Sequence, residues 1–161
     1  MQIVHALRTG AEIEKTMAFG EITEVVPWDV LAHDCGQDLS EPQCAVPRAF
    51  KSHATWENIC KGARYVYVAR DPLDAFYSFY KFLPAYTNLK PGDITQEQFA
   101  EAIFAGVSHS GQIWHHFLSW WEQRTNPDVM WIFYEDLKED LPGKLSSRRH
   151  TRRVPSGAYK P

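Results

Sequence analysis

The sequence lacks any apolar run near the roughly 20 residues that a membrane-spanning helix requires, and its apolar runs are only strand-sized. No basic-then-apolar signal segment opens it, so nothing marks the chain for export. Its three cysteines are scattered without a Cys-x-x-Cys pair, which argues against a disulfide framework and against a zinc or other metal site. These absences predict a cytoplasmic protein that has neither a membrane segment nor a metal ion.

Acidic residues are missing from the C-terminal end. All 20 Asp and Glu residues lie at or before Asp140, whereas six of the 17 Lys and Arg residues follow it. A basic segment of this kind can contact nucleic acid or an anionic membrane. The same segment contains Ser, Gly and Pro and little to bury, which favours a solvated, disordered tail and neither of those partners. We therefore predict one domain over residues 1–140 and a divergent basic tail over residues 141–161.

The rest of the chain has enough apolar material for one globular domain, with 44% apolar and 14% aromatic residues. Stretches rich in β-branched and aromatic residues predict strands over 64–69 and 129–134, and residues 48–53 predict a shorter one. The first of these is apolar on both faces, as is typical of a central parallel strand. Residues 20–47 are expected to form loops with short helical turns.

Helix signals separate these predicted strands. Asp71 is a suitable N-cap and Pro72 suits the first helical position, so a helix is predicted from there to a stop before Pro84. Thr95 opens a capping box and a second helix that ends near residue 106. Further helices are predicted over 1–7, without a capping residue, and over 111–124, whose tryptophans are expected to pack, with Trp120 as the one most open to solvent. Alternating strands and helices predict an α/β domain with a parallel sheet.

Arg70 directly follows the predicted strand 64–69 and precedes a helix N-terminus. Ligands of open parallel sheets bind at the carboxyl ends of strands, where exposed amide groups and the helix dipole favour an anion. Ser78 lies two turns along the same helix, so its hydroxyl could reach a second oxygen of that anion. The spacing is typical of a phosphate site, but it fits equally well a packed Ser78 and an Arg70 that pairs with Asp71, Asp74 or Glu135.

His53 ends the predicted strand 48–53, and Lys51 lies on the same face. A neutral imidazole there could take a proton from a hydroxyl, while Lys51 would stabilise negative charge and lower the imidazole pKa. Tyr134 follows the second strand, so its ring could stack on a purine or be buried with one hydrogen bond. Histidines more often have a surface or structural role, as we expect for His109, His115 and His116.

Four parts of the sequence together resemble the cytosolic sulfotransferase family. This family transfers a sulfuryl group from 3′-phosphoadenosine-5′-phosphosulfate (PAPS) to hydroxyls or amines. The resemblance implies a P-loop-like three-layer α/β domain whose central parallel sheet is flanked by helices. It is carried by residues 2–10 with 20–28, by Pro47-Arg-Ala-Phe-Lys-Ser-His53, by residues 65–78, and by residues 111–140 with Trp120-Trp-Glu and Tyr134-Glu-Asp-Leu-Lys.

The resemblance also implies a role for each candidate residue. His53 would be the general base on a small phenol, alcohol or amine, and Lys51 would line the acceptor site beside it. Arg70 and Ser78 would hold the 3′-phosphate of PAPS, and Tyr134 would lie near the adenosine. Transfer would be in line, without a covalent intermediate, and would depend mainly on positioning and on stabilising charge.

The sequence departs from the family pattern at both ends. The donor loop of the type Tyr-Pro-Lys-Ser-Gly-Thr-Thr-Trp does not precede residues 2–10, and no Arg-Lys-Gly segment follows Asp140. We therefore expect a domain that is incomplete at both ends and impaired as a catalyst, since one lost donor of this kind costs about 10²- to 10³-fold. The alternative is a non-catalytic remnant that binds adenosine 3′,5′-bisphosphate (PAP) weakly or acts only through protein contacts. A small-molecule kinase is disfavoured, because the sequence contains no Gly-x-x-x-x-Gly-Lys-[Ser/Thr] loop.

Overall fold

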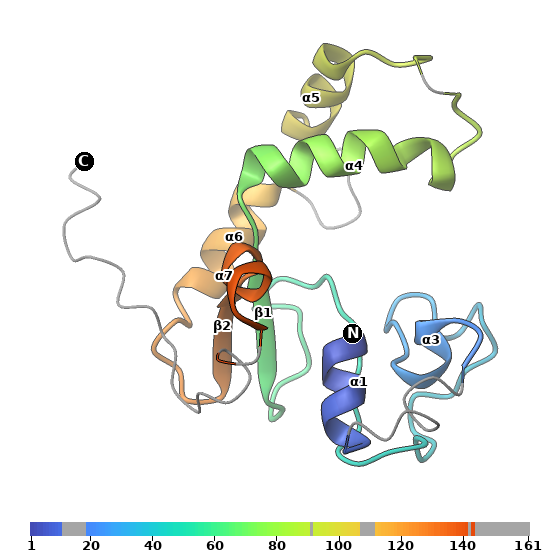
Figure 1. Ribbon diagram of the computed structural model, residues 1–161, viewed down its shortest axis with the longest axis vertical. Helices are drawn as coiled ribbons and strands as arrows, with labels where there is room; N and C mark the ends of the chain where they lie inside the picture. Colours follow the sequence, from blue (N-terminus) through green and yellow to red (C-terminus); the bar gives the residue numbers. More distant parts are fainter. Residues whose placement is uncertain (11–18, 91, 107–111, 142, 144–161) are drawn as a thin grey trace. The chain divides into compact units, whose positions relative to one another are not determined.

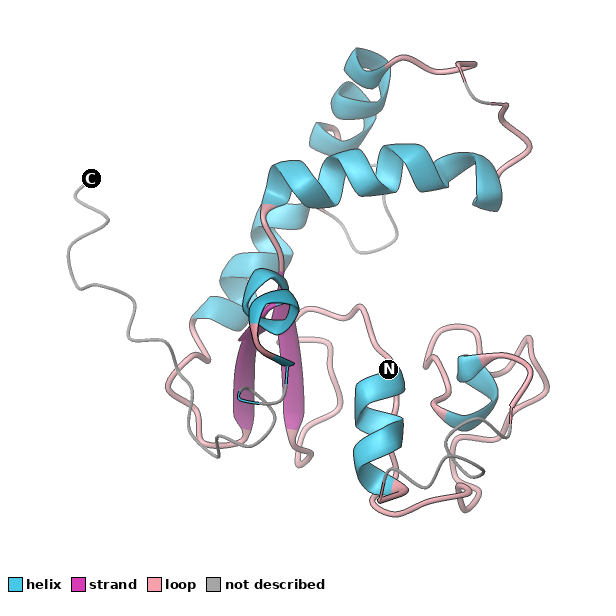
Figure 2. Cartoon of the chain, viewed as in Figure 1, coloured by secondary structure: helices cyan, strands magenta, loops and turns pink. Residues whose placement is uncertain are grey.

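The computed structural model describes residues 1–10, 19–90, 92–106, 112–141 and 143 of the chain (Figure 1). The chain divides into two compact units, Met1–His53 and Ala54–Pro161. The predicted basic tail therefore falls almost wholly outside the described residues. Figure 2 shows that the described strands belong to the second unit, while the described part of the first consists of helices and loops.

The described part of the first unit contains two short helices. Helix α1 (Gln2–Arg8) begins without a side-chain cap, as its sequence predicts, and buries His5. Helix α3 (Ile22–Val25) is a single turn closed by a capping box between Glu21 and Glu24. The expected loops with short helical turns over residues 20–47 are confirmed.

The predicted strand over residues 48–53 is wrong. Only Lys51 pairs, in a single parallel bridge with Trp28. Two residues earlier, the Gln43 side-chain amide bonds both backbone groups of Ala49, at 2.9 Å to its nitrogen and 3.0 Å to its oxygen. A side chain thus takes the place of a partner strand, and the ladder cannot extend beyond one bridge.

The second unit is built on a parallel pair of strands, β1 (Tyr65–Ala69) and β2 (Val129–Phe133). Their register places Ala69 beside Phe133, so both strands end at the same edge. The described part of the long connection between them carries three helices, in keeping with the long crossover that a parallel pair needs. The predicted α/β arrangement with a parallel sheet is therefore confirmed.

An aromatic cluster covers one face of this sheet. Its buried members include Trp120 and Trp131, each 5% exposed. The centroid of the Tyr67 ring lies 4.4 Å from that of the Trp131 ring and 5.3 Å from that of the Trp120 ring. On the other face of β1, Val66 and Val68 remain 50% and 51% exposed. The expectation that both faces of this strand are buried is thus wrong.

Helix α6 (Ile113–Trp121) supplies much of the aromatic cluster. Trp120 is buried and donates its indole N–H to the Ala54 carbonyl at 3.0 Å, whereas Trp114 is 49% exposed. Trp120 was expected to be the exposed tryptophan of this helix, and that expectation is wrong. The reason is that Trp120 faces the sheet together with Phe117, and a hydrogen-bond acceptor lies within reach of its indole.

Helix α4 (Pro72–Tyr86) is longer than predicted because it continues through Pro84. A proline in the last turn removes only one intrahelical hydrogen bond, and the Thr87 hydroxyl donates to the Leu83 carbonyl at 2.9 Å. Helix α5 (Gln96–Phe104) begins with the predicted capping box at Thr95. After β2, helix α7 (Tyr134–Glu139) starts directly at the strand end.

Candidate functional site

Two strand-to-helix junctions meet at the carboxyl edge of the sheet. Arg70 lies between β1 and α4, and Tyr134 opens α7 directly after β2. Because the register pairs the last residues of the two strands, these junctions are neighbours. This is the edge at which open parallel sheets bind ligands.

The amide groups at the start of α4 are already bonded within the protein. The Asp71 side chain accepts hydrogen bonds from the amides of Leu73 and Asp74, at 2.9 and 3.1 Å. The Asp71 amide itself donates to Glu135 Oε1 at 2.9 Å, and Pro72 has no N–H to offer. Asp71 is therefore the predicted N-cap, but the expectation of exposed amides for an anion is wrong. An anion beside this helix must be held by side chains.

Arg70 makes no ion pair among the residues that the structure describes. Its guanidinium lies 4.7 Å from the centroid of the Tyr134 ring, and its Nε is buried without a hydrogen-bond partner. The carboxylates of Asp71 and Glu135, which the sequence offered as alternative partners, accept hydrogen bonds from backbone amides instead. A buried donor without an acceptor costs about 1–3 kcal/mol, so an incoming ligand oxygen would recover that free energy.

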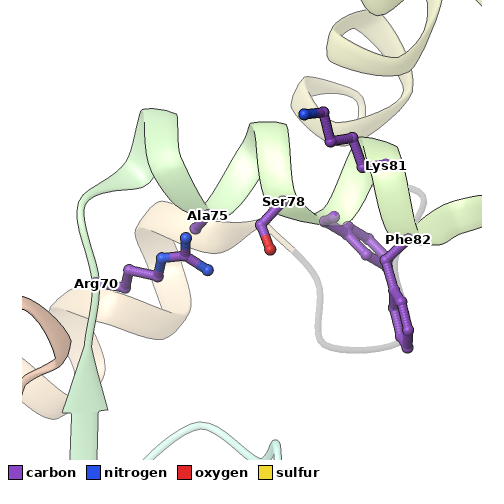
Figure 3. A pocket seen from close by; sticks show the side chains of 6 residues that line it. Arg70, Ala75, Ser78, Lys81 and Phe82 are labelled. Carbon is purple, nitrogen blue, oxygen red and sulfur yellow. The ribbon is translucent and has the colours of Figure 1, made fainter. Parts of the chain in front are cut away.

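Arg70 and Ser78 line one open pocket of about 410 Å³. Figure 3 shows the guanidinium and the Ser78 hydroxyl directed into the same space, the first from the turn after β1 and the second from α4. None of the lining residues is acidic, so the pocket is cationic. The full lining consists of Arg70, Ala75, Ser78, Phe79, Lys81 and Phe82.

Lys81 is a pocket residue that the sequence reasoning missed. Its stem lines the pocket one turn beyond Ser78, and its ammonium lies 4.4 Å from the centroid of the Tyr77 ring. The signal was present, because a residue three positions after Ser78 lies on a neighbouring part of the same helix surface. Figure 3 shows its ammonium turned away from the space that Arg70 and Ser78 enter, so its positive charge reaches a ligand there only when the flexible stem moves. The pocket lining also includes Phe79 and Phe82.

Tyr134 lies beside the guanidinium of Arg70. Its side chain is 36% exposed, so the alternative of a buried tyrosine is wrong. The ring contacts Arg70 and, at 6.0 Å, Lys138 through cation–π interactions. Stacking of Tyr134 on a purine stays a prediction.

Lys51 and His53 belong to the first unit, where both contact Trp28. The Lys51 ammonium lies 3.5 Å from the centroid of the Trp28 ring, and the His53 and Trp28 ring centroids are 4.9 Å apart. Burial lowers the pKa of the Lys51 ammonium, and the carboxylates of Glu21 and Asp29 offset part of that shift. The sequence reasoning missed Trp28, because only the single bridge to Lys51 brings it to this segment.

The remaining histidines add no metal centre to the described part of the chain. His115 is exposed, and His116 stacks on Tyr67 with ring centroids 5.8 Å apart. His109 lies outside the described residues. No group of three His, Cys, Asp or Glu side chains among the described residues could hold a metal ion. None of the described helices is long and apolar enough to cross a membrane.

Comparison with protein families identifies one domain. The family model of the sulfotransferase domain matches residues 10–147. Sulfotransferase 1 family member D1 of Mus musculus is 37% identical over 102 residues, which cover 58% of this chain and 33% of the relative. Sulfotransferase 1E1 of Bos taurus is 34% identical over 107 residues, which cover 62% of this chain and 35% of the relative. The chain thus spans about a third of the length of these relatives.

Solved structures give the same result for the fold. Mouse sulfotransferase SULT7A1, crystallised with PAP, matches with a TM-score of 0.50 at 30% identity, over 60% of this chain and 37% of that protein. Retinol dehydratase in a complex with retinol and PAP matches with a TM-score of 0.61 over 89% of this chain and 52% of that protein. At 20% identity the second likeness concerns the fold alone. The P-loop-like α/β fold expected from the sequence is confirmed.

Proposed function

Because the chain belongs to the sulfotransferase family, we propose that it takes part in sulfuryl transfer from PAPS to a hydroxyl or amine of a small acceptor. In this proposal the pocket beside α4 holds the 3′-phosphate of the donor. The observation that carries it is the buried, unpartnered Nε of Arg70 at a cationic pocket shared with Ser78. The crystal structure of a mouse sulfotransferase with PAP supports the choice of ligand.

The side chains of the pocket suit a phosphate monoester. Such a group carries close to two negative charges at pH 7, since its second pKa is about 6. Arg70 presents a planar fork of N–H donors, and the Ser78 hydroxyl can donate to another oxygen. Lys81 offers a second positive charge on a flexible stem. Because the amides of α4 are occupied, recognition would depend on these three side chains.

The acceptor chemistry is assigned to the first unit. His53 would take the proton from the acceptor hydroxyl while the acceptor oxygen forms a bond to sulfur and the bond from sulfur to the bridging donor oxygen breaks, which releases PAP. Lys51 would stabilise the negative charge that develops. The contacts of Trp28 with Lys51 and His53 support this pairing, because one ring limits the motion of both side chains.

Calorimetric titration with PAP tests the phosphate pocket. We expect Arg70→Ala to weaken PAP binding about 10- to 100-fold, since hydrogen bonds to a charged group are worth about 1.5–3 kcal/mol. Arg64→Ala is the matched control, because Arg64 is an exposed arginine just before the opposite end of β1. Binding of 5′-AMP, which has no 3′-phosphate, should change little in either variant. Equal PAP affinity for the wild-type chain and Arg70→Ala would refute the proposal.

A sulfate-transfer assay with a panel of phenols tests whether the chain catalyses transfer and whether His53 acts as the general base. We expect slow turnover by this 161-residue polypeptide, because its sequence contains no donor-loop lysine. His53→Ala should lower that turnover further, by about 10²- to 10⁴-fold for a general base. Retained PAP binding with no turnover at all would favour the non-catalytic alternative, and rapid turnover would contradict the expected impairment.

A further inference from the structure

Glu135 connects the two strand-to-helix junctions beside the pocket. Its Oε1 accepts a hydrogen bond from the Asp71 amide at 2.9 Å. That amide belongs to the peptide unit that joins Arg70 to Asp71. The bond therefore restricts the backbone orientation of Arg70, whose side chain carries the proposed phosphate contact.

The residue before Glu135 contacts the side chain of the same arginine. The Tyr134 ring lies 4.7 Å from the Arg70 guanidinium carbon. Arg70 is thus contacted in two places. The Tyr134 ring lies beside its guanidinium, and the Glu135 carboxylate accepts a hydrogen bond from the amide of the peptide that follows it. The register of β1 and β2 makes this possible, because Ala69 pairs with Phe133 and the next residues of each chain segment are neighbours.

We propose that Glu135 is a positioning residue, which holds the peptide after Arg70 so that the guanidinium of Arg70 is presented to the α4 pocket. This inference rests on the proposed function of that pocket as a phosphate site. Glu135 does not line the pocket and is not assigned a contact with the ligand. Its negative charge would by itself disfavour a nearby phosphate, so the benefit must come from its hydrogen bond.

Three variants separate the hydrogen bond from the charge. Glu135→Ala removes both, and we expect it to weaken PAP binding about threefold to tenfold, which corresponds to one hydrogen bond of about 0.5–1.5 kcal/mol. Glu135→Gln keeps an acceptor oxygen and should retain the wild-type affinity or bind slightly more tightly. Glu139→Ala, an exposed carboxylate at the other end of α7, is the control for loss of charge.

A double-mutant cycle tests whether Glu135 acts through Arg70. In an Arg70→Ala background, Glu135→Ala should have no further effect on PAP affinity, because the residue that it positions is gone. Additive losses in the cycle would overturn the proposal. A general loss of structure is checked by the thermal unfolding midpoint of each variant. If Arg70→Ala weakens PAP binding and Glu135→Ala does not, the phosphate site stands and the positioning role is refuted.

Hydrogen exchange and NMR of the ligand-free chain test the positioning role of Glu135 independently of whether the pocket binds phosphate. In Glu135→Ala we expect faster hydrogen exchange at the Asp71 amide and a shifted NMR signal of the Arg70 Nε–H, since that group lies beside the Tyr134 ring. Both signals should be near their wild-type values in Glu135→Gln. Unchanged exchange and an unchanged Nε–H signal in Glu135→Ala would overturn the inference even if the chain does not bind PAP.

Discussion

The two units of the chain are stabilised by different interactions. In residues 54–141 an aromatic cluster around Trp120 and Trp131 covers one face of a parallel strand pair. In residues 1–53 the buried side chains include His5 and Thr9 as well as Val26 and Ala32, and polar side chains join segments that lie far apart in sequence. The difference shows that the second unit is built mainly on aromatic packing, whereas polar side-chain contacts hold together the segments of the first unit.

Arg8 is the centre of the polar network in the first unit. Its guanidinium donates to the Gln43 side chain at 2.5 Å, to the Val25 carbonyl, and to His5 Nδ1 at 3.2 Å. Gln43 in turn bonds the backbone of Ala49, two residues before Lys51. The position of the Lys51 and His53 segment therefore depends on partly buried polar contacts, which are costly when one partner is lost.

Among the variants that test this difference between the units, we expect Trp131→Ala to lower the unfolding free energy most. Removal of a large buried aromatic side chain costs about 3–5 kcal/mol of unfolding free energy, because the lost transfer free energy adds to that of the cavity. Urea unfolding followed by far-UV circular dichroism would measure it. Trp114→Ala is the matched control, since Trp114 is 49% exposed, and it should cost less than about 1 kcal/mol. Equal costs for the two variants would show that the aromatic cluster does not stabilise the sheet.

Arg8→Ala is expected to lower the unfolding free energy somewhat less than Trp131→Ala. The loss of several hydrogen bonds to a charged group should cost about 2–3 kcal/mol. The amides of Lys51 and Asp29, which form the bridge with the Trp28 segment, should exchange faster in the same variant. Arg8→Lys should recover little, because an ammonium cannot reproduce the planar fork. Leu7→Ala, at a 60% exposed position of the same helix, is the control. Unchanged exchange at both amides in Arg8→Ala would contradict the proposed polar network.

The smallest expected effect on stability comes from the titration of the Tyr67 hydroxyl, which lies within the aromatic cluster. Burial raises the pKa of Tyr67 to about 12. The unfolded chain loses this proton near pH 10 and the folded chain only near pH 12, so stability is complete below pH 10 and falls as the pH rises toward 12. The loss should be about 1–2 kcal/mol, less than the full shift would give, because solvent still reaches part of the Tyr67 side chain.

Tyr67→Phe tests this pH dependence, because it removes the titrating group. Its urea midpoint should fall less between pH 9 and pH 11 than that of the wild-type chain. Tyr77→Phe, at a 46% exposed tyrosine, should behave like the wild type. An alkaline loss of stability that is the same in Tyr67→Phe and in the wild type would show that this phenol is not its source.

Much of the second unit is predictable from local sequence. The Asp71 and Thr95 caps and the two strands all lie where their residue patterns indicate. Caps and strand patterns are local, so neighbouring residues suffice to define them. The first unit is less predictable, because the Gln43 side chain that replaces a partner strand for Ala49 lies six residues away and leaves no periodic signal.

In the candidate site, too, some features are predictable from the local sequence and others are not. The order of residues is enough to predict that Arg70 directly follows a strand, that Ser78 lies on the helix after it, and that the chain resembles sulfotransferases. Two features are visible only in the folded protein: Glu135 accepts the hydrogen bond of the Asp71 amide, and Arg70 Nε is left without an acceptor. Both features depend on the pairing of Ala69 with Phe133, a contact across 64 positions that no local pattern encodes.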